Sequence, residues 1–367
     1  MLKKLNKIET IKYLDRTIGN SILKLLPIKN PHFPDRIKSI LVIRPGGIGD
    51  AVLLIPTIKK IEKIFPKAKI RILAEKRNAE VFSLFDCNCE VFRYDKPSEF
   101  LRILKHKRYD LVFDTEQWHI LSSIIARYVG KFVIGFDTNE RRKNLDVRVG
   151  YSHTRYEVDS FLDLLERYCR YAGLSVDKKW NYPFLNIKTS KLLYDVVVFT
   201  GASIEQRKWD IVKYVKLINK LNDLDLKIAL IGAKNDVDFN KKIAKDCKVD
   251  DFTGKTDLKK TAKIIASSRL LFSTDSGILH IGAALGIKTV SLFGPGIEYK
   301  WAPKGKNHKT VNMYLPCSPC TRFGYTLKCP YAVRCMKEID VDRVFKAITS
   351  LLQNTLFVAL QPRRQYN

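Results

Sequence analysis

Two short glycine-containing segments hold the side chains with the clearest potential for chemistry. In the first, Gly46-Gly47-Ile48-Gly49-Asp50 follows an apolar run and precedes a helical pattern. In the second, Asp275-Ser276-Gly277 follows an apolar run and precedes a helical pattern that contains His280. Glycines let the backbone turn tightly near a ligand, and the free N–H groups of a helix start bind anions. Both segments are therefore candidate sites for a phosphorylated ligand.

The residues alone leave two roles open for each carboxylate in these segments. Asp50 lies where an N-cap would stabilise a helix start, and it is also a candidate general base. Asp275 is either a cap or, with the backbone N–H groups of Ser276 and Gly277, part of a diphosphate site. His280 either belongs to that site or is a helix residue turned inward.

A third candidate segment follows an apolar run at residues 195–199. Thr200-Gly201-Ala202-Ser203 is followed there by Arg207-Lys208-Trp209. A loop with a hydroxyl and two cations suits a pyrophosphate leaving group, because the cations offset the charge that develops as the bond breaks. An adjacent Arg and Lys are also common on solvated surfaces.

The elements that position these segments alternate between strand and helix, and the alternation occurs twice. This pattern predicts an α/β fold of two Rossmann-like domains with parallel sheets. Residues 139–155, rich in Arg and polar side chains, are expected to form a mobile loop, and residues 181–190 an interdomain linker. Expected strands are 39–44, 70–73, 91–94, 111–113, 132–134, 195–199, 227–231, 270–273 and 289–293, and expected helices are 51–65, 158–172, 210–221, 238–246 and 278–285.

The charge balance narrows the class of partner. The chain has 66 Lys and Arg against 38 Asp and Glu, a net charge of +28, which attracts polyanions. No zinc finger, RNP motif or basic zipper is present, so a phosphorylated substrate or an anionic membrane face is favoured over nucleic acid. A Lys-rich proteome would also raise the charge. Residues 1–36 have the pattern of a basic amphipathic helix, which either docks on a membrane or packs on the protein itself.

The cysteines suggest a reducing compartment. No export signal or membrane-spanning stretch is visible, so the eight cysteines are expected mostly as free thiols in the cytoplasm. Cys317, Cys320, Cys329 and Cys335 form one CxxC followed by irregular gaps, a weaker zinc pattern than two paired CxxC motifs. Thiols without a metal are the expectation, and zinc is the alternative.

In their order along the chain, these motifs resemble those of glycosyltransferase family nine, the lipopolysaccharide heptosyltransferases and their relatives. The resemblance covers about residues 40–344. It rests on residues 43–53 with Pro56, on Gly201-Ala202-Ser203 before Arg207-Lys208-Trp209, on Ser273-Thr274-Asp275-Ser276-Gly277 with His280, on Leu292-Phe293-Gly294-Pro295, and on Cys317-Ser318-Pro319-Cys320.

The resemblance implies a GT-B fold, in which two Rossmann-like domains face a central cleft, and an inverting reaction without a metal ion or other cofactor. Asp50 looks like the general base that takes the proton of the acceptor hydroxyl. Implied donor-binding residues are Ser203, Arg207, Lys208, Asp236, Thr256, Asp275, Ser276, Gly277 and His280. Together with the patterns above, it divides the chain into an N-terminal helix (1–36), an acceptor-binding domain (37–185), a donor-binding domain (190–345) and a C-terminal helix and tail (346–367).

The candidate acceptor-binding arginines are chosen for the groups that their side chains can bind, and not because they match a motif. The arginines within residues 139–155 suit an anionic glycolipid, because Arg binds phosphate and carboxylate in a bidentate fashion. A solvated flexible loop is the alternative. The candidate acceptor-binding residues are Gly47, Gly49, Arg141, Arg142, Arg148 and Arg155.

The function implied by the resemblance is transfer of a heptose from ADP-heptose to a lipopolysaccharide core or a related surface glycan. The enzyme would be cytoplasmic and peripheral on the inner membrane. Thr256 stands where heptosyltransferases proper can have a larger apolar contact to the nucleobase, so another nucleotide sugar remains an alternative. An NAD-dependent enzyme is supported by Glu75 and disfavoured by Val52, which replaces the third glycine of a dinucleotide fingerprint. A catalytically silent scaffold is disfavoured by the intact Asp50 and Asp275.

Overall fold

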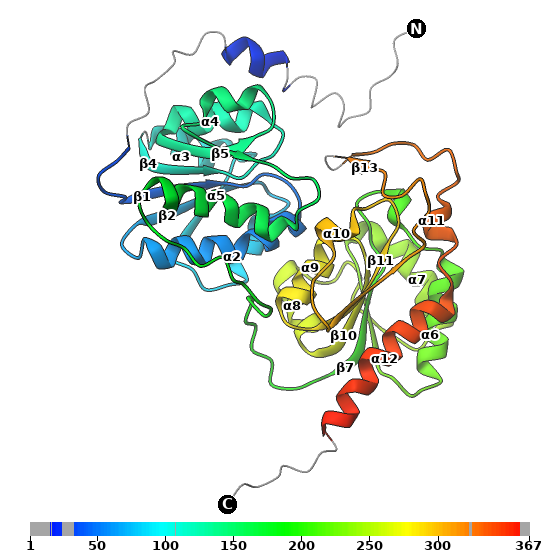
Figure 1. Cartoon of the computed structure of the whole chain (residues 1–367). Helices are drawn as coiled ribbons and strands as arrows, with labels where there is room; N and C mark the ends of the chain where they lie inside the picture. The colour runs from blue at the N-terminus through cyan, green and yellow to red at the C-terminus, as the bar shows by residue number, and fades with distance from the viewer. Residues whose placement is uncertain (1–14, 16, 24–32, 107, 323–324, 360–367) are drawn as a thin grey trace, which may run out of the picture. The chain divides into compact units, whose positions relative to one another are not determined.

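The chain forms two compact units, Met1–Trp180 and Asn181–Asn367, each with one parallel six-stranded sheet (Figure 1). The coordinates are a computed structural model that describes residues 15, 17–23, 33–106, 108–322 and 325–359. Counted within its unit, each sheet has the strand order 3-2-1-4-5-6. This is the order of a Rossmann fold. The predicted α/β fold of two Rossmann-like units is confirmed.

The central strands of the first unit are mostly apolar and buried because helices cover both faces of its sheet. In Figure 1, α3 and α4 lie on one face, and α2 and α5 lie on the other. The strands are β1 (Ser39–Ile43), β2 (Lys69–Ala74), β3 (Cys89–Arg93), β4 (Tyr109–Asp114), β5 (Gly130–Asp137) and β6 (Val147–Gly150). The helices are α2 (Ile48–Ile64), α3 (Pro97–Lys105), α4 (Ile120–Val129) and α5 (Glu157–Tyr171), with short 3₁₀ turns η1 (Ala79–Ser83) and η2 (Glu140–Asn144).

The second unit repeats this arrangement around a core that includes the buried rings of Trp209, Tyr214 and Phe272. Its strands are β7 (Tyr194–Phe199), β8 (Ile228–Ile231), β9 (Asp250–Asp251), β10 (Ser268–Thr274), β11 (Lys288–Phe293) and β12 (His308–Asn312), and a separate hairpin pairs β13 (Thr321–Arg322) with β14 (Tyr325–Thr326). Its helices are α6 (Ile211–Asn222), α7 (Val237–Asp246), α8 (Leu258–Ala266), α9 (Gly277–Ala284), α10 (Glu298–Trp301), α11 (Arg334–Lys337) and α12 (Val341–Ala359), with 3₁₀ turns η3 (Glu205–Arg207) and η4 (Lys234–Asp236).

The strand order creates a switch point in each sheet, where successive connections leave in opposite directions. Ligands of such sheets bind outside the carboxyl ends of the two strands at this point. In the first unit these strands are β1 and β4, and in the second they are β7 and β10. The three candidate segments of the sequence follow β1, β7 and β10. The topology therefore places them where this architecture binds ligands.

The expected mobile loop at residues 139–155 is wrong. Residues 140–144 form η2, and β6 pairs with β5 in parallel register at the edge of the sheet. Val147 and Val149 are buried while Arg148 is exposed, so the strand has the period-two pattern of a half-buried edge. The segment was predicted to be a loop because it is rich in arginine, although the alternation of Val147, Arg148 and Val149 is that of a strand.

Most of the N-terminal helix expected at residues 1–36 lies outside the described residues. Asp15 and residues 17–23 are helical, and the Asp15 carboxylate accepts hydrogen bonds from the backbone N–H groups of Ile120 (2.9 Å) and Leu121 (3.1 Å). Burial acts to raise the pKa of Asp15, but His119 and these two N–H groups outweigh it and lower the pKa. The described part of this segment therefore caps α4.

Helices long and apolar enough to cross a bilayer are absent from the described part of the chain.

Candidate functional site

The loop between β1 and α2 holds Asp50 in the first turn of the helix. Gly46 has a φ of 113°, which a residue with a side chain rarely adopts, and Gly47 is the N-cap. Asp50 is the third helical residue, and its Oδ2 accepts a hydrogen bond from the Gly47 N–H at 3.2 Å. The N-cap position considered for Asp50 is therefore wrong. A carboxylate accepts several hydrogen bonds, so the half-buried Asp50 retains capacity for a ligand.

A buried cation lies under this loop, and sequence reasoning missed it. The Arg44 guanidinium donates to the Thr115 carbonyl (2.8 Å) and forms an ion pair with Glu116 (3.3 Å), which joins the ends of β1 and β4. Burial acts to lower the pKa of Arg44, but Asp50, Glu116 and Glu157 outweigh it and raise the pKa. The sequence did offer one signal: Arg44 directly follows the apolar strand β1, and Glu116 lies two residues after β4. It does not show that the two strands are adjacent.

The same edge of the first unit carries a second buried carboxylate. The Tyr151 hydroxyl donates to both Glu157 oxygens (3.1 and 3.0 Å), and the Gln117 amide donates to Glu157 Oε1 at 2.5 Å. Burial and the Glu157 charge raise the pKa of Tyr151. These hydrogen bonds give the switch point of the first unit a fixed polar wall around Asp50 and Arg44.

The structure separates the four candidate arginines into one buried and three exposed. Arg141 is completely buried, is ion-paired with Asp114, and donates to the Phe136 carbonyl at 2.8 Å. It links η2 to the sheet and does not present its guanidinium to a ligand, so the structure contradicts the acceptor-binding role expected for Arg141. Arg142, Arg148 and Arg155 are exposed; Arg155 forms an ion pair with Asp163 at 3.1 Å.

In the second unit, the segments that follow β7 and β10 are joined. The Thr274 hydroxyl donates to the Gly201 carbonyl at 2.9 Å. Arg207 reaches Asp275 twice, by a hydrogen bond from Nη1 to the backbone carbonyl (3.2 Å) and by an ion pair with Oδ2 (3.3 Å). Asp275 is 6% exposed. The structure thus brings together residues that are about seventy positions apart in the sequence.

Helix α9 starts directly after Asp275, and its cap is Ser276 rather than Asp275. Ser276 Oγ accepts a hydrogen bond from the Leu279 N–H at 3.4 Å. His280 is turned inward and 3% exposed, and burial lowers its pKa to about 4, so it is neutral near pH 7. This leaves Asp275 free of a capping role.

Three of the polar side chains around α9 have buried atoms without a hydrogen-bond partner in the described structure. They are Arg207 Nε, Asp275 Oδ2 and His280 Nδ1. The ion pair between Arg207 and Asp275 has the distance of an electrostatic contact but lacks hydrogen-bond geometry at Oδ2. Because a buried unpaired polar atom costs about 1–3 kcal/mol, three of them in one place indicate a site built for a ligand.

The remaining candidate donor-binding residues differ in exposure and in their hydrogen-bond or ion-pair partners. A Cβ on Gly201 would lie 2.7 Å from Asp236 Oδ2, so the Asp236 carboxylate contacts the loop after β7. Ser203 is exposed, and Lys208 forms an ion pair with Glu205 at 2.6 Å. The hydroxyl of Thr256 is hydrogen-bonded to that of Thr261 in α8, at 2.8 Å.

The cysteines follow the expectation in most positions. Six are free thiols, while Cys87 and Cys89 form a disulfide. Burial raises the pKa of Cys335 to about 11 and also raises that of Cys320. Among the residues the structure describes, no group of three or more His, Cys, Asp or Glu side chains is arranged to hold a metal ion.

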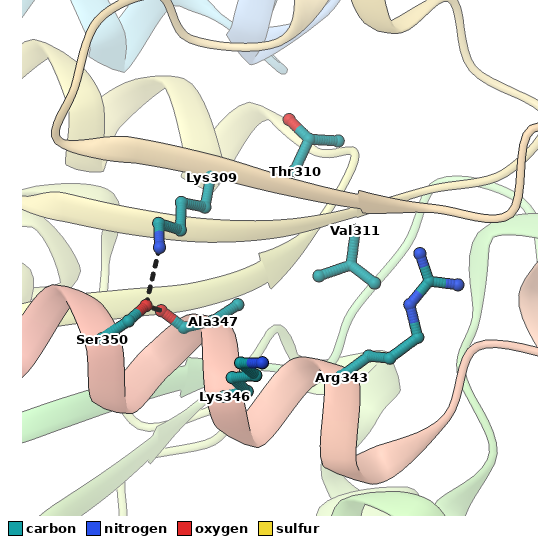
Figure 2. Close-up of a pocket in the computed structure, with 7 residues that line it drawn as sticks. All are labelled: Lys309, Thr310, Val311, Arg343, Lys346, Ala347 and Ser350. Atoms are coloured by element: carbon teal, nitrogen blue, oxygen red, sulfur yellow. Dashed lines mark hydrogen bonds between the residues drawn. The ribbon is translucent and has the colours of Figure 1, made fainter.

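A shallow hollow of about 430 Å³ lies between edge strand β12 and helix α12 (Figure 2). Lys309 donates to Ser350 Oγ at 2.7 Å there, and Arg343 projects from α12 toward Val311. The three cations of the hollow form no ion pair within the described residues, so it attracts anions. It contains none of the candidate site residues. Its lining is Lys309, Thr310, Val311, Arg343, Lys346, Ala347 and Ser350.

Two Rossmann-like units in one chain, each with polar segments at its switch point, are the components of a GT-B fold. The sequence model of glycosyltransferase family 9 (heptosyltransferase) matches residues 98–330. The chain therefore belongs to glycosyltransferase family 9, and it is an enzyme that transfers a sugar.

Individual relatives agree with this assignment. The chain is 25% identical to lipooligosaccharide heptosyltransferase 2 of Campylobacter jejuni, over 86% of this chain and 99% of that protein. The glycosyl transferase family 9 structure from Veillonella parvula matches with a TM-score of 0.70 and 17% identity, covering 89% of this chain and 100% of that one. The E. coli ADP-heptose lps heptosyltransferase II matches with a TM-score of 0.69 and 20% identity, covering 87% and 99%. At these identities the structural matches show the fold.

Proposed function

We propose that this enzyme transfers a heptose from ADP-heptose to an anionic glycolipid of the lipopolysaccharide core or a related surface glycan. The C. jejuni relative is a lipooligosaccharide heptosyltransferase, and the E. coli structure is that of an ADP-heptose heptosyltransferase. In this proposal the reaction inverts the anomeric centre and uses no metal ion. Residues 37–185 bind the acceptor, and residues 190–345 bind the donor.

The observation that carries the proposal is the set of unpartnered atoms on Arg207, Asp275 and His280. A nucleotide sugar offers partners to the first two of these residues. Its diphosphate accepts from the Arg207 guanidinium, and a sugar hydroxyl donates to the Asp275 carboxylate. The N–H groups at the start of α9, at Ser276 and Gly277, favour the diphosphate through the helix dipole.

The other donor residues complete this assignment. Ser203 and Lys208 lie in the loop after β7 and would hold the diphosphate with Arg207. Asp236, in contact with that loop, would accept from the ribose hydroxyls. Thr256 would contact the nucleobase. Since Thr256 is small and its hydroxyl is already hydrogen-bonded to that of Thr261 in α8, a nucleotide sugar with a different base is the second candidate donor.

Asp50 acts as the general base in the proposed step. The acceptor oxygen forms a bond to the anomeric carbon while the bond from that carbon to the diphosphate oxygen breaks. The hydroxyl proton passes to Asp50, and the bonding electrons leave with ADP. Arg207 and Lys208 offset the negative charge that builds on the leaving group.

The acceptor is held in this proposal by the loop glycines Gly47 and Gly49 and by the exposed Arg142, Arg148 and Arg155. Three guanidinium groups suit the phosphates and carboxylates of an anionic glycolipid. The net charge of +28 supports a peripheral position on the inner membrane, at its cytoplasmic face, where such an acceptor is made.

The donor is tested by titrating the purified enzyme with ADP, ADP-heptose, UDP-sugars and NAD in a calorimeter, and by mass spectrometry of co-purified nucleotide. We expect ADP-heptose to bind and NAD not to bind. Tight binding of NAD without ADP-heptose binding would overturn the proposal. Full activity in EDTA is expected, and loss of activity that a single added metal restores would contradict the metal-free step.

The base is tested by Asp50→Asn. Loss of the base should lower turnover by roughly 10²–10⁴-fold while the enzyme still folds and binds nucleotide. Asp86→Asn makes the same chemical change at an exposed position of the same unit and should have no effect. Near-normal turnover of Asp50→Asn would remove this assignment.

A further inference from the structure

The loop after β11, residues 294–297, contacts the Asp275 carboxylate at Gly296, where there is no space for a side chain. A Cβ built on Gly296 would lie 2.1 Å from Asp275 Oδ2 and 3.1 Å from its Cγ. Real Cβ atoms essentially never come closer than 3.0 Å to another heavy atom. Two groups therefore contact Asp275 Oδ2. One is Arg207 Nη1, at 3.3 Å, and the other is the backbone of Gly296.

The cysteine-containing segment holds this loop in place. The backbone N–H groups of Cys320 and Thr321 donate to the Pro295 carbonyl at 3.1 and 2.9 Å. The Ser318 hydroxyl donates to the Gly294 carbonyl. Residues 318–321, which we call the clamp, thus bind two consecutive carbonyls of the loop.

The other side of the loop is packed against the start of α11. A Cβ on Gly294 would lie 2.7 Å from the Met336 sulfur and 3.0 Å from Cys335 Sγ, and both side chains are buried. The loop is therefore confined on both sides. Its position is set by the clamp and by α11, and the orientation of Asp275 depends on its position.

We propose that Gly296 and the clamp residue Ser318 are positioning residues that orient the Asp275 carboxylate toward the donor. This inference rests on the donor-binding role proposed for Asp275. It assigns a function to the cysteine segment that does not depend on its thiols: the segment works through backbone N–H groups and one serine hydroxyl.

The proposal predicts that Gly296→Ala weakens donor binding without unfolding the enzyme. The atom that the new methyl group meets is the far end of a side chain, so the Asp275 carboxylate can move away while the backbone stays. Displacing a charged hydrogen-bonding group should raise the Kd for ADP-heptose about tenfold or more. The KM for the acceptor should stay unchanged. Ser318→Ala should raise the same Kd, by a smaller factor.

Two controls match these changes. A Cβ on Gly150 meets nothing within 4 Å, so Gly150→Ala adds a methyl group in open space. Thr349→Ala removes a hydroxyl that is bonded only within α12. Both should leave the Kd for ADP-heptose within about twofold of wild type.

A double-mutant cycle with Asp275→Asn tests whether Gly296 acts through Asp275. If it does, the two substitutions together should raise the Kd hardly more than Asp275→Asn alone, because residues that act as one unit are not additive. Additive effects, or a Gly296→Ala enzyme that binds as tightly as Gly150→Ala, would overturn the inference while leaving the proposed function intact. Should Gly296→Ala fail to fold, a Ser318→Ala enzyme with the wild-type Kd overturns it equally. A wild-type enzyme that binds no nucleotide sugar contradicts the proposed function itself.

Discussion

At the residue scale, neighbouring arginines in one sequence run have opposite environments. Arg141 and its partner Asp114 are both completely buried, whereas Arg142 is exposed. Removing one member of a buried pair leaves an uncompensated charge. Arg141→Met should therefore destabilise the enzyme by about 3–5 kcal/mol, and Arg142→Met by less than about 0.5 kcal/mol.

Chemical denaturation measures both values in one series. Arg142→Met should instead raise the KM for an anionic acceptor, which would connect the exposed guanidinium to substrate. A stable Arg141→Met enzyme with a raised acceptor KM would reverse the two roles.

His280 makes the stability of the enzyme depend on pH. Its pKa is about 4 in the folded state against an ordinary value of 6.5, so between these values the unfolded chain binds the proton and the folded chain does not. The contribution of neutral His280 to the free energy of unfolding is fully present well above pH 6.5 and decreases progressively as the pH falls towards 4. At pH 5 the loss is about 2 kcal/mol. His280→Gln should lose less stability than wild type between pH 7 and pH 5. Equal losses in thermal melts at the two pH values would contradict this.

At the element scale, the N-terminal segment contributes a cap to a helix far along the chain. Asp15 accepts from the first N–H groups of α4 and is 5% exposed. Asp15→Ala should lower the free energy of unfolding by about 0.5–2 kcal/mol, in the range of a lost helix cap. Glu62→Ala removes a carboxylate that bonds a single exposed N–H and should cost less. Equal stabilities of the two variants would show that the cap contributes nothing.

The elements that the sequence predicted well are those with one strong signal. Buried strands such as β1 and β8 are unbroken apolar runs in the sequence, because helices cover both faces of a parallel sheet. Element ends shifted by a few residues: α2 begins at Ile48 rather than at residue 51, because the cap is a glycine without a side chain to mark it. The edge strands β6, β9 and β12 were missed, since they are short and half exposed.

The site was predictable only where one segment carried the signal. The sequence singled out Asp50 and Asp275, each beside glycines. Arg44, Glu116 and Gly296 contact residues far away in the chain, and their local sequence does not show which residues these are. Arg141 illustrates the opposite error, because the sequence shows a charge but not the buried carboxylate that neutralises it.

At the scale of the whole molecule, the net charge of +28 predicts attraction to anionic lipid. The hollow between β12 and α12 has three cations without an ion pair to any described residue, and we expect anionic lipid to bind there. Replacing Lys309, Arg343 and Lys346 by Gln should weaken binding to phosphatidylglycerol vesicles by about 1 kcal/mol per charge. Sedimentation with vesicles at low and at high salt measures this.

A control of equal charge is available on α8. Lys259, Lys260 and Lys263 are exposed and form no ion pair in the described structure, so replacing them by Gln removes the same three charges elsewhere on the unit. If both triple variants lose the same affinity, only the total charge matters. If neither loses any, the proposed membrane association is contradicted.

Each sheet is complete within its own unit, because neither borrows a strand from the other. A chimaera joined to a relative between Trp180 and Asn181 would keep both sheets and both switch points intact. If the second unit binds the donor as proposed, recombination at this seam would exchange the sugar-nucleotide half of one enzyme for that of another, and sugar choice would be engineered while the proposed acceptor-binding half is left as it is.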